Sequence, residues 1–191
     1  MEFLLGELLL KLEQFDLYAV AAGPGSFTGL RVGLTAAKGW AEVYGKPIAA
    51  VSALEAVAAQ ARSTADLLVP VLDARRGELY FGFYKRTRDG LAVEGDECSA
   101  TPEEFVSAVR ERAGANAFAI VTPVPELLVS VMSRFETKLV PIEGVSIVLA
   151  PMIGQLGLAR ARRGETVDAL RLDANYVRRS DAELKWKVPE R

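Results

Sequence analysis

A strand–loop–helix pattern near the start of the chain constrains its fold more than any other feature. The apolar run 17–21 is followed by a Gly-Pro-Gly turn at 23–25, and a helical pattern rich in small residues then extends over 26–44. Residues 48–51 predict a second strand directly after this helix. Strands that alternate with helices in this way are typical of α/β proteins.

The predicted helix carries Gly29, Gly33 and Ala37 on one stripe, at a spacing of four residues. Each interior glycine costs a helix about 1 kcal/mol relative to alanine. Two of them on one stripe indicate that another backbone packs very close to the helix. The sheet of the same chain is the simplest partner. An apolar helix expected over 2–13 strengthens the case for another protein, because it too has apolar surface to bury.

The rest of the sequence repeats the alternation of strands and helices. Residues 2–62 predict helix, strand, helix, strand, helix, and residues 67–163 predict three strands followed by the order helix, strand, helix, strand, helix. We interpret this order as two copies of one α/β unit, the first without its three opening strands. The expected organisation is a first lobe over 1–63, a second lobe over 64–165 and a tail over 166–191. The further expected elements are helices over 52–62, 101–112, 125–134 and 150–163, and strands over 67–72, 79–84, 118–121, 138–141 and 175–177, with one more strand ending near 98.

The composition excludes most kinds of catalytic site. The 191 residues include no histidine and one cysteine, Cys98, so Ser-His-Asp and Cys-His catalysis, an intrachain disulfide and histidine-ligated metal sites are all excluded within this sequence. Carboxylate, lysine or backbone chemistry remains, and we expect no metal and no cofactor. We also expect no leader peptide and no membrane-spanning helix.

Two motifs have both a functional and a structural interpretation. The loop of Gly23, Gly25 and Ser26 could hold an anion on the free N–H groups of the following helix, or it could simply turn the chain and cap that helix. It lacks the Gly-Lys-Ser/Thr ending of a phosphate-binding P-loop, and the capping role is the favoured interpretation. Asp73 and Glu78 could form a catalytic carboxylate pair, although such charged turns are more often only solvated.

Three stretches of this sequence resemble the TsaB family. They are Gly-Pro-Gly-Ser-Phe-Thr-Gly-Leu-Arg-Val-Gly at 23–33, Val-Ser-Ala-Leu-Glu at 51–55 and Asp-Ala-Arg-Arg-Gly-Glu-Leu-Tyr at 73–80. Asn-Tyr-Val-Arg-Arg at 175–179 and Trp-Lys at 186–187 are similar to the ending of that family, so the resemblance covers the whole chain. TsaB proteins are the dimerisation subunits of the bacterial machinery that makes threonylcarbamoyladenosine in tRNA.

The resemblance implies a two-lobed, actin-like/ribonuclease-H-like duplication and a cytoplasmic protein without catalytic activity. The implied partners are the catalytic subunit TsaD, the ATPase TsaE in the same complex, and a second copy of the chain in a possible homodimer, with tRNA contacted only indirectly and no membrane. The helices over 2–13 and 26–44 would form the partner interface. The residues expected in it are Leu4, Leu8, Gly29, Leu30, Gly33, Ala37 and Trp40.

One departure from the family pattern and two alternatives remain. TsaB proteins begin with three strands, whereas this sequence starts at the first helix, so we expect a shortened first lobe. The main alternative is a nucleotide-binding or phosphotransferase protein of the same actin-like fold, which would need an acidic residue on the first of those strands. Direct binding of tRNA is the second alternative, because residues 160–191 carry nine basic and six acidic side chains. The candidate tRNA-binding residues are Arg160, Arg162, Arg163, Arg178 and Arg179.

Overall fold

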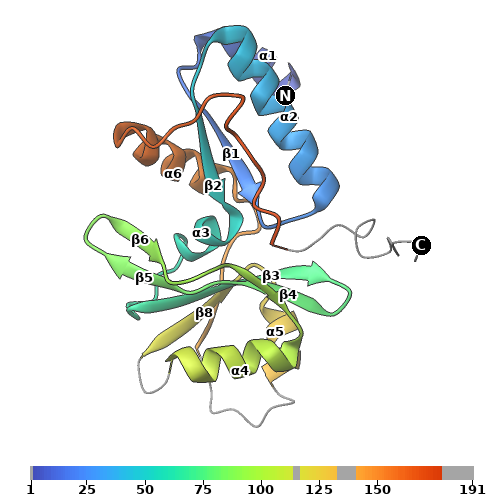
Figure 1. Cartoon of the computed structure of the whole chain (residues 1–191), viewed down its shortest axis with the longest axis vertical. Helices are drawn as coiled ribbons and strands as arrows, with labels where there is room; N and C mark the ends of the chain where they lie inside the picture. Colours follow the sequence, from blue (N-terminus) through green and yellow to red (C-terminus); the bar gives the residue numbers. More distant parts are fainter. Residues whose placement is uncertain (1, 114–116, 133–140, 178–191) are drawn as a thin grey trace, which may run out of the picture.

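The computed structural model describes residues 2–113, 117–132 and 141–177. Within these ranges the strands form two separate sheets (Figure 1). The first sheet consists of the parallel strands β1 (Tyr18–Gly23) and β2 (Ile48–Ser52). The second sheet consists of β3 (Leu67–Arg75), β4 (Glu78–Phe81), β5 (Tyr84–Thr87), β6 (Gly90–Val93), β7 (Cys98–Ala100), β8 (Phe118–Thr122) and β9 (Ile142–Gly144).

The first sheet is covered on both faces by helices. Side chains alternate along β1, so that Tyr18 and Ala22 face α2 (Phe27–Tyr44) while Ala19 faces α6 (Ala150–Arg162). Gly157 of α6 is buried directly on this sheet: a Cβ atom added there would lie 2.5 Å from the Cβ of Ala19. This glycine, which the sequence analysis did not single out, is where a helix backbone approaches the sheet most closely.

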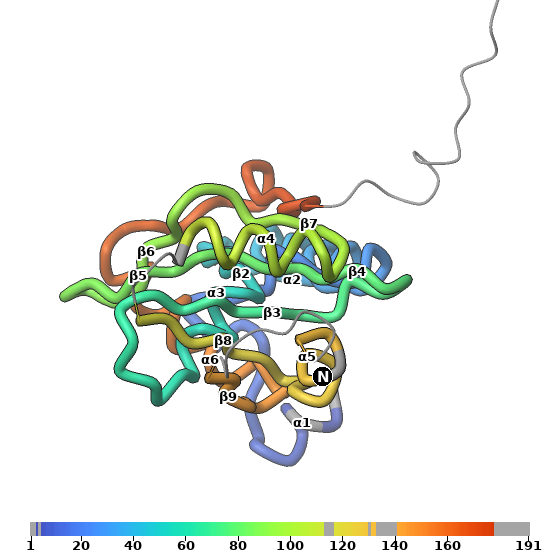
Figure 2. Tube along the Cα trace, turned by 90° about the horizontal axis from the view of Figure 1, so that it is seen from below, coloured from blue at the N-terminus to red at the C-terminus, as the bar shows by residue number. Residues whose placement is uncertain are grey.

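The second sheet also has two packed faces. Leu67, Val69 and Val71 of β3 pack against α4 (Pro102–Ala113) and α5 (Pro125–Met132) on one face, and Leu68 faces the opposite core. A strand buried on both faces is continuously apolar, which is why 67–72 is recognisable in the sequence. Figure 2 shows β3, β8 and β9 in succession, in agreement with their parallel pairing.

The short helix α3 (Ala53–Ala58) lies between the two sheets (Figure 1). Leu54, Val57 and Ala58 contribute to the core of the second sheet, and Ala56 contributes to the core under α6. The chain after α6 also returns to the first sheet, because Val167 exchanges two backbone hydrogen bonds of 2.9 Å with Ile48. The two halves of the molecule are therefore joined through α3 and through the chain that follows α6.

Several helix ends agree with their sequence signals. Ser26 accepts a hydrogen bond from the N–H of Gly29 at the start of α2, and Gly45 ends that helix in the left-handed conformation with φ 61°. Thr101 and Glu104 hydrogen-bond each other's backbone N–H groups and so form a capping box at the start of α4. None of the described helices is both long and apolar enough to cross a membrane.

Four element predictions need correction. The helix expected over 2–13 is divided into α1 (Glu2–Glu7) and the 3-10 turn η1 (Leu12–Gln14), because Leu9 adopts a left-handed φ of 52° that ends α1. The strand expected over 79–84 breaks after Phe81 into β4 and β5, which both pair with β3. The helix from Ser52 ends at Ala58 rather than near residue 62.

The fourth correction concerns the strand expected over 175–177. These residues form no strand, and a single backbone hydrogen bond of 2.7 Å joins the N–H of Asn175 to the carbonyl of Ala22. The strand expected over 138–141 falls almost wholly outside the described residues, which resume at 141. The expected lobe boundaries, the duplication and the three missing strands stay predictions, although α6, expected with the second lobe, packs on the first sheet.

Replacing Gly157 with alanine is expected to destabilise the protein by about 1–3 kcal/mol, because the added methyl group overlaps Ala19 and crowds Ala49. Chemical denaturation followed by circular dichroism measures this change. Gly154→Ala on the same helix is the matched control, since a Cβ there meets no atom within 4 Å, and we expect it to be neutral or slightly stabilising. Equal effects of the two substitutions would contradict the close packing of α6 on the sheet.

Candidate functional site

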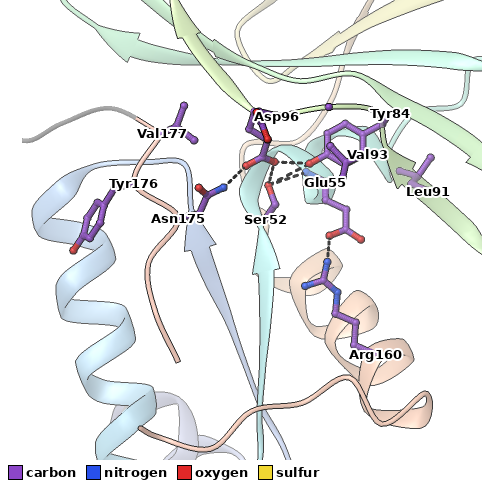
Figure 3. Close-up of a pocket in the computed structure, with 12 residues that line it drawn as sticks. Ser52, Glu55, Tyr84, Leu91, Val93, Asp96, Arg160, Asn175, Tyr176 and Val177 are labelled. Atoms are coloured by element: carbon purple, nitrogen blue, oxygen red, sulfur yellow. Dashed lines mark hydrogen bonds and ion pairs between the residues drawn. The ribbon is translucent and has the colours of Figure 1, made fainter. Parts of the chain in front are cut away.

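A cavity of about 580 Å³ lies between the two halves of the molecule (Figure 3). Its walls come from the end of β2, the start of α3, strands β5 and β6, the loop 95–97, α6 and the segment 175–177. Elements far apart in the sequence therefore meet here, as they do in most ligand sites. The volume falls within the range of small-molecule pockets, so the chemistry of its polar groups decides what it can do.

The carboxylate of Glu97 collects hydrogen bonds from three segments of the chain. It accepts hydrogen bonds from the hydroxyl groups of Ser52 and Tyr84 and from the side-chain amide of Asn175, the last at 2.6 Å (Figure 3). Burial, and next the hydrogen bond to the Glu97 carboxylate, raise the pKa of Tyr84 well above its ordinary value. Tyr84 therefore stays protonated and acts as a fixed donor rather than as a base.

An ion pair between Glu55 and Arg160 forms another wall of the cavity. Arg160 also donates a hydrogen bond to the carbonyl of Ala50, so that it connects α6 to both β2 and α3. Burial raises the pKa of the Glu55 carboxyl, and the nearby guanidinium of Arg160 opposes that rise. Because both side chains are mostly buried, each depends on the other to offset the loss of its hydration.

The polar groups of the cavity satisfy one another. Ser52 illustrates this: its hydroxyl donates to Glu97 and accepts from the N–H groups of Leu54 and Glu55 as the N-cap of α3. Among the described residues, no buried side-chain polar atom lacks a partner, and no group of three or more acidic, cysteine or histidine side chains is placed to hold a metal ion. These interactions hold the walls of the cavity together, and they engage the hydroxyl groups of Ser52 and Tyr84 in hydrogen bonds.

The loop of Gly23, Gly25 and Ser26 contacts the chain's own C-terminal segment. Gly23 has a φ of 129°, and a Cβ atom added to it would lie 2.4 Å from the carbonyl oxygen of Asn175. A carbonyl oxygen thus lies beside this loop, and Ser26 is used as the helix cap. The geometry agrees with a turn that caps α2 and packs against the segment around Asn175. The binding of an anion by this loop stays an untested prediction.

Two of the residues expected in a partner interface point into the chain's own core. Leu30 is 8% exposed and Ala37 is 3% exposed, and Leu30 packs with Tyr18 on the first sheet. Gly33 faces Val20 of the same sheet, 4.0 Å from an added Cβ atom. Leu30 and Ala37 therefore belong to the inner face of α2, and their expected place in a partner interface stays a prediction.

The other expected interface residues that the structure describes are less buried, and Trp40 lies at the edge of the inner face. Gly29 and Leu8 are exposed, and Trp40 is half-buried with its ring 5.8 Å from that of Tyr18. The side chain of Leu4 lies outside the described part of the structure. Although α1 overlaps α2 in Figure 1, the two helices lie apart in Figure 2.

One stripe on the outward side of α2 is made of small and apolar residues, of which sequence reasoning singled out only Gly29. Val32 and Val43 are 66% and 74% exposed, and an added Cβ at Gly39 would meet no atom within 4 Å. Their spacing of three and four residues was available as a signal, but the inner stripe of the same helix has the same periodicity. We call this set the outer stripe; it consists of Gly29, Val32, Ala36, Gly39 and Val43.

The remaining chemical candidates have structural partners. Asp73 binds the backbone N–H of Arg75 at 2.7 Å and its guanidinium at 3.3 Å, and Glu78 accepts a hydrogen bond from Ser99. Burial, followed by the negative charges of Asp96 and Glu97, raises the pKa of the Cys98 thiol, which disfavours a reactive thiolate. Of the basic candidates, Arg160 is paired with Glu55 and Arg163 with Glu165, while Arg178 and Arg179 lie outside the described residues.

Comparison with known proteins identifies the family. A sequence model of the family described as TsaD, tRNA N6-adenosine threonylcarbamoyltransferase, matches residues 1–132. The tRNA threonylcarbamoyladenosine biosynthesis protein TsaB of Haemophilus influenzae is 31% identical over 194 aligned positions, which cover 93% of this chain and 75% of that protein. The chain belongs to the TsaB family.

Two further relatives agree with this assignment. TsaB of Bacillus subtilis is 52% identical over 66 residues, 35% of this chain. The chain spans 29% of that protein's length, well under two-thirds. The solved structure of YeaZ from Pseudomonas aeruginosa superposes with a TM-score of 0.75 at 26% identity, covering 92% of this chain and 79% of that one. The mixed α/β architecture of this TsaB-family chain therefore resembles the actin-like fold of YeaZ.

Replacing Arg160 with methionine is expected to destabilise this TsaB-family chain by roughly 3–5 kcal/mol near pH 8, because it leaves the Glu55 carboxylate buried without its cation. The loss should shrink toward pH 5. Without Arg160 the pKa of Glu55 rises further above its unfolded value, so protonation relieves the buried charge as the pH falls through that raised pKa. Urea unfolding at the two pH values measures both effects.

Arg163→Met provides the control, since Arg163 pairs with Glu165 at the surface and its loss should change stability only slightly at either pH. A pH-independent loss in Arg160→Met would contradict the assignment of Glu55 as its buried partner.

Proposed function

We propose that this protein is a non-catalytic scaffold subunit of the cytoplasmic complex that makes threonylcarbamoyladenosine in tRNA, and that it binds and activates the catalytic subunit TsaD. The observation that carries the proposal is the outer stripe of α2. An 18-residue helix with a buried inner face presents, on its outward side, a stripe of glycine, alanine and valine beside the exposed charges of Arg31 and Glu42. Such a face allows another helix to approach closely and to bury apolar surface on contact.

The names of the relatives support the pathway and the partner. The Haemophilus influenzae relative is named for threonylcarbamoyladenosine biosynthesis, and the family model that matches residues 1–132 is named for the transferase TsaD. A chain that is similar both to a TsaB protein and to the TsaD family fits a complex of two subunits with similar folds. In such a complex TsaD performs the transfer and this chain holds TsaD in place. In this proposal TsaE joins the complex, and tRNA is contacted by the partners rather than by this chain.

The interface that we propose differs in part from the one expected from sequence. Gly29 is kept, and Val32, Ala36, Gly39 and Val43 replace the buried Leu30 and Ala37. Gly33 and Trp40 stay proposed as residues near its border, and Leu4 and Leu8 stay proposed as a separate contact beside α1 (Figure 2). TsaD is the occupant that we favour, and a second copy of this chain is the competing occupant of the same face.

The absence of histidine and the satisfied cavity support a role without turnover. Acid–base catalysis near neutral pH most often uses histidine, and this sequence has none. In the cavity the Tyr84 hydroxyl is kept protonated and the Ser52 hydroxyl is engaged as a helix cap, so neither is free to attack a substrate. We therefore propose that this chain contributes binding energy and orientation while TsaD contributes the chemistry.

A nucleotide-binding function is the alternative, and the position of the cavity between the two halves favours it. The charge of the cavity argues against it. Glu55, Asp96 and Glu97 line the walls together with one cation, Arg160, which is already paired with Glu55. The polyphosphate of a nucleotide would therefore meet an excess of negative charge.

Isothermal calorimetry with ATP and Mg²⁺ tests this alternative. We expect no binding by the isolated chain at nucleotide concentrations up to about 1 mM, because no unpaired cation of the cavity faces the phosphates. Binding in the micromolar range would favour the alternative over the scaffold.

Replacing Gly39 with leucine is expected to weaken binding to the cognate TsaD by at least about tenfold, because the larger side chain would stand between the two surfaces. The isolated chain should keep or gain stability, since the site is open and leucine favours the helix more than glycine does. Surface plasmon resonance measures the affinity, and thermal denaturation measures the stability.

The matched control is Gly154→Leu, which adds the same side chain to an open, exposed position of α6. It should leave TsaD binding unchanged. If Gly39→Leu binds TsaD like the parent but loses self-association in sedimentation experiments, the outer stripe serves a homodimer and our choice of occupant is wrong.

A further inference from the structure

The chain after α6 forms a strap, residues 165–177, that returns along the first half of the molecule to its junction with the second half (Figure 1). Val167 pairs with Ile48 at the edge of β2, and Leu172 is 2% exposed within the core between α2 and the first sheet. The strap is thus anchored in the first half before its last described residues reach the cavity. Sequence reasoning treated it as a tail.

Asn175 makes the central contact of the strap. Its backbone N–H donates to the carbonyl of Ala22 at 2.7 Å, and its side-chain amide donates to the Glu97 carboxylate at 2.6 Å. Ala22 belongs to β1 in the first half, whereas Glu97 directly precedes β7 in the second. One residue therefore connects the two halves directly through two hydrogen bonds.

The residues on either side of this contact extend it to α2 and to the second core. The ring of Tyr176 lies 5.4 Å from that of Phe27, and its hydroxyl accepts a hydrogen bond from Nε of Arg31 at 3.3 Å. Arg31 in turn stacks over Phe27 at 3.9 Å. Val177 packs against the core of the second half. Within three residues, the strap thus contacts α2, β1, the cavity and the second sheet.

The side chains at this end of the strap are only partly enclosed. Tyr176 and Asn175 are exposed, and the Arg31 to Tyr176 hydrogen bond lies at the surface. In contrast, every residue except Glu55 is buried in the helix α3 that also joins the two halves. The exposed contacts can therefore break without opening either hydrophobic core, as is typical of locally unfolding segments.

We propose that Asn175, Tyr176 and Val177 form a latch that sets the separation of the two halves and closes one wall of the cavity. When the latch is closed, Glu97 is fully hydrogen-bonded and the first turns of α2 are held by Tyr176. When it opens, the halves are joined through α3 and the linkers beside it, and they move relative to each other about that helix. The latch is a property of this chain alone and does not depend on the proposed partner.

The experiment measures the distance between the halves in the full-length chain. Spin labels are placed on cysteines introduced at Glu42 of α2 and Glu103 of α4, both exposed, in a Cys98→Ser background. The opening variant is Asn175→Asp, which places a second carboxylate against that of Glu97. Double electron–electron resonance should give one narrow distance distribution for the parent and a broader or shifted one for the variant.

Two further variants make the result specific. Tyr176→Ala removes the contact with Phe27 and should broaden the distribution as well, whereas Tyr176→Phe keeps the ring contact and should stay close to the parent. Hydrogen exchange should rise at least ~10-fold over residues 175–177 in the two opening variants and stay unchanged in β3.

The proposal is overturned if Asn175→Asp and Tyr176→Ala, with β3 still protected, keep the parent's distance distribution and exchange rates. If Asn175→Asp loses protection in β3, it has unfolded globally, and Tyr176→Ala then decides alone, because it alters a surface contact. An identical broadening in Tyr176→Phe would also count against the latch, since that variant retains the packing on Phe27.

Discussion

The arrangement of this molecule depends on the burial of one short helix between two sheets. Four of the six residues of α3 are alanine or valine, and the side chains of Leu54 and Val57 enter the core of the second sheet while Ala56 enters the core under α6. Small side chains let both layers approach the helix axis, since packing distance between elements is set by side-chain size. The residues at its start, Ser52 and Glu55, are also the ones that organise the cavity. The joint between the halves and the polar site are consequently built from the same turn of helix.

The sequence predicted the parts of this fold that are governed by local signals. The continuous apolar run of β3, the extent of α2 after Ser26 and the start of α4 near Thr101 all depend on neighbouring residues, and the structure has them where they were expected. Errors arose where distant contacts decide. The break between β4 and β5 follows from both strands pairing with β3, and the position of 175–177 follows from hydrogen bonds to Ala22 and Glu97.

The candidate site was less accessible to sequence reasoning than the fold. Glu55 lies in the first turn of α3, where a carboxylate favours the start of a helix, but its side chain pairs with Arg160, 105 residues further along the chain. Glu97 belongs to no recognisable sequence motif, because the three groups that donate hydrogen bonds to it come from β2, β5 and the strap, which are distant in the sequence. The glycines of α2 have the periodicity of a helix, but their direction is ambiguous. A helix whose inner and outer stripes both contain small residues does not reveal from sequence which stripe faces the sheet.

The strap also has a consequence for the order in which the chain folds during synthesis. The core between the second sheet and its helices α4 and α5 draws on residues 67–131, a contiguous part of the chain. The cores around the first sheet need Ile153 and Leu172 in addition to residues near the start. On the ribosome the middle of the protein can therefore fold before the cores of the first sheet, which need the later residues Ile153 and Leu172. Contacts between such distant parts of the chain slow folding. Until they form, the apolar surface of the first sheet stays exposed and can bind chaperones.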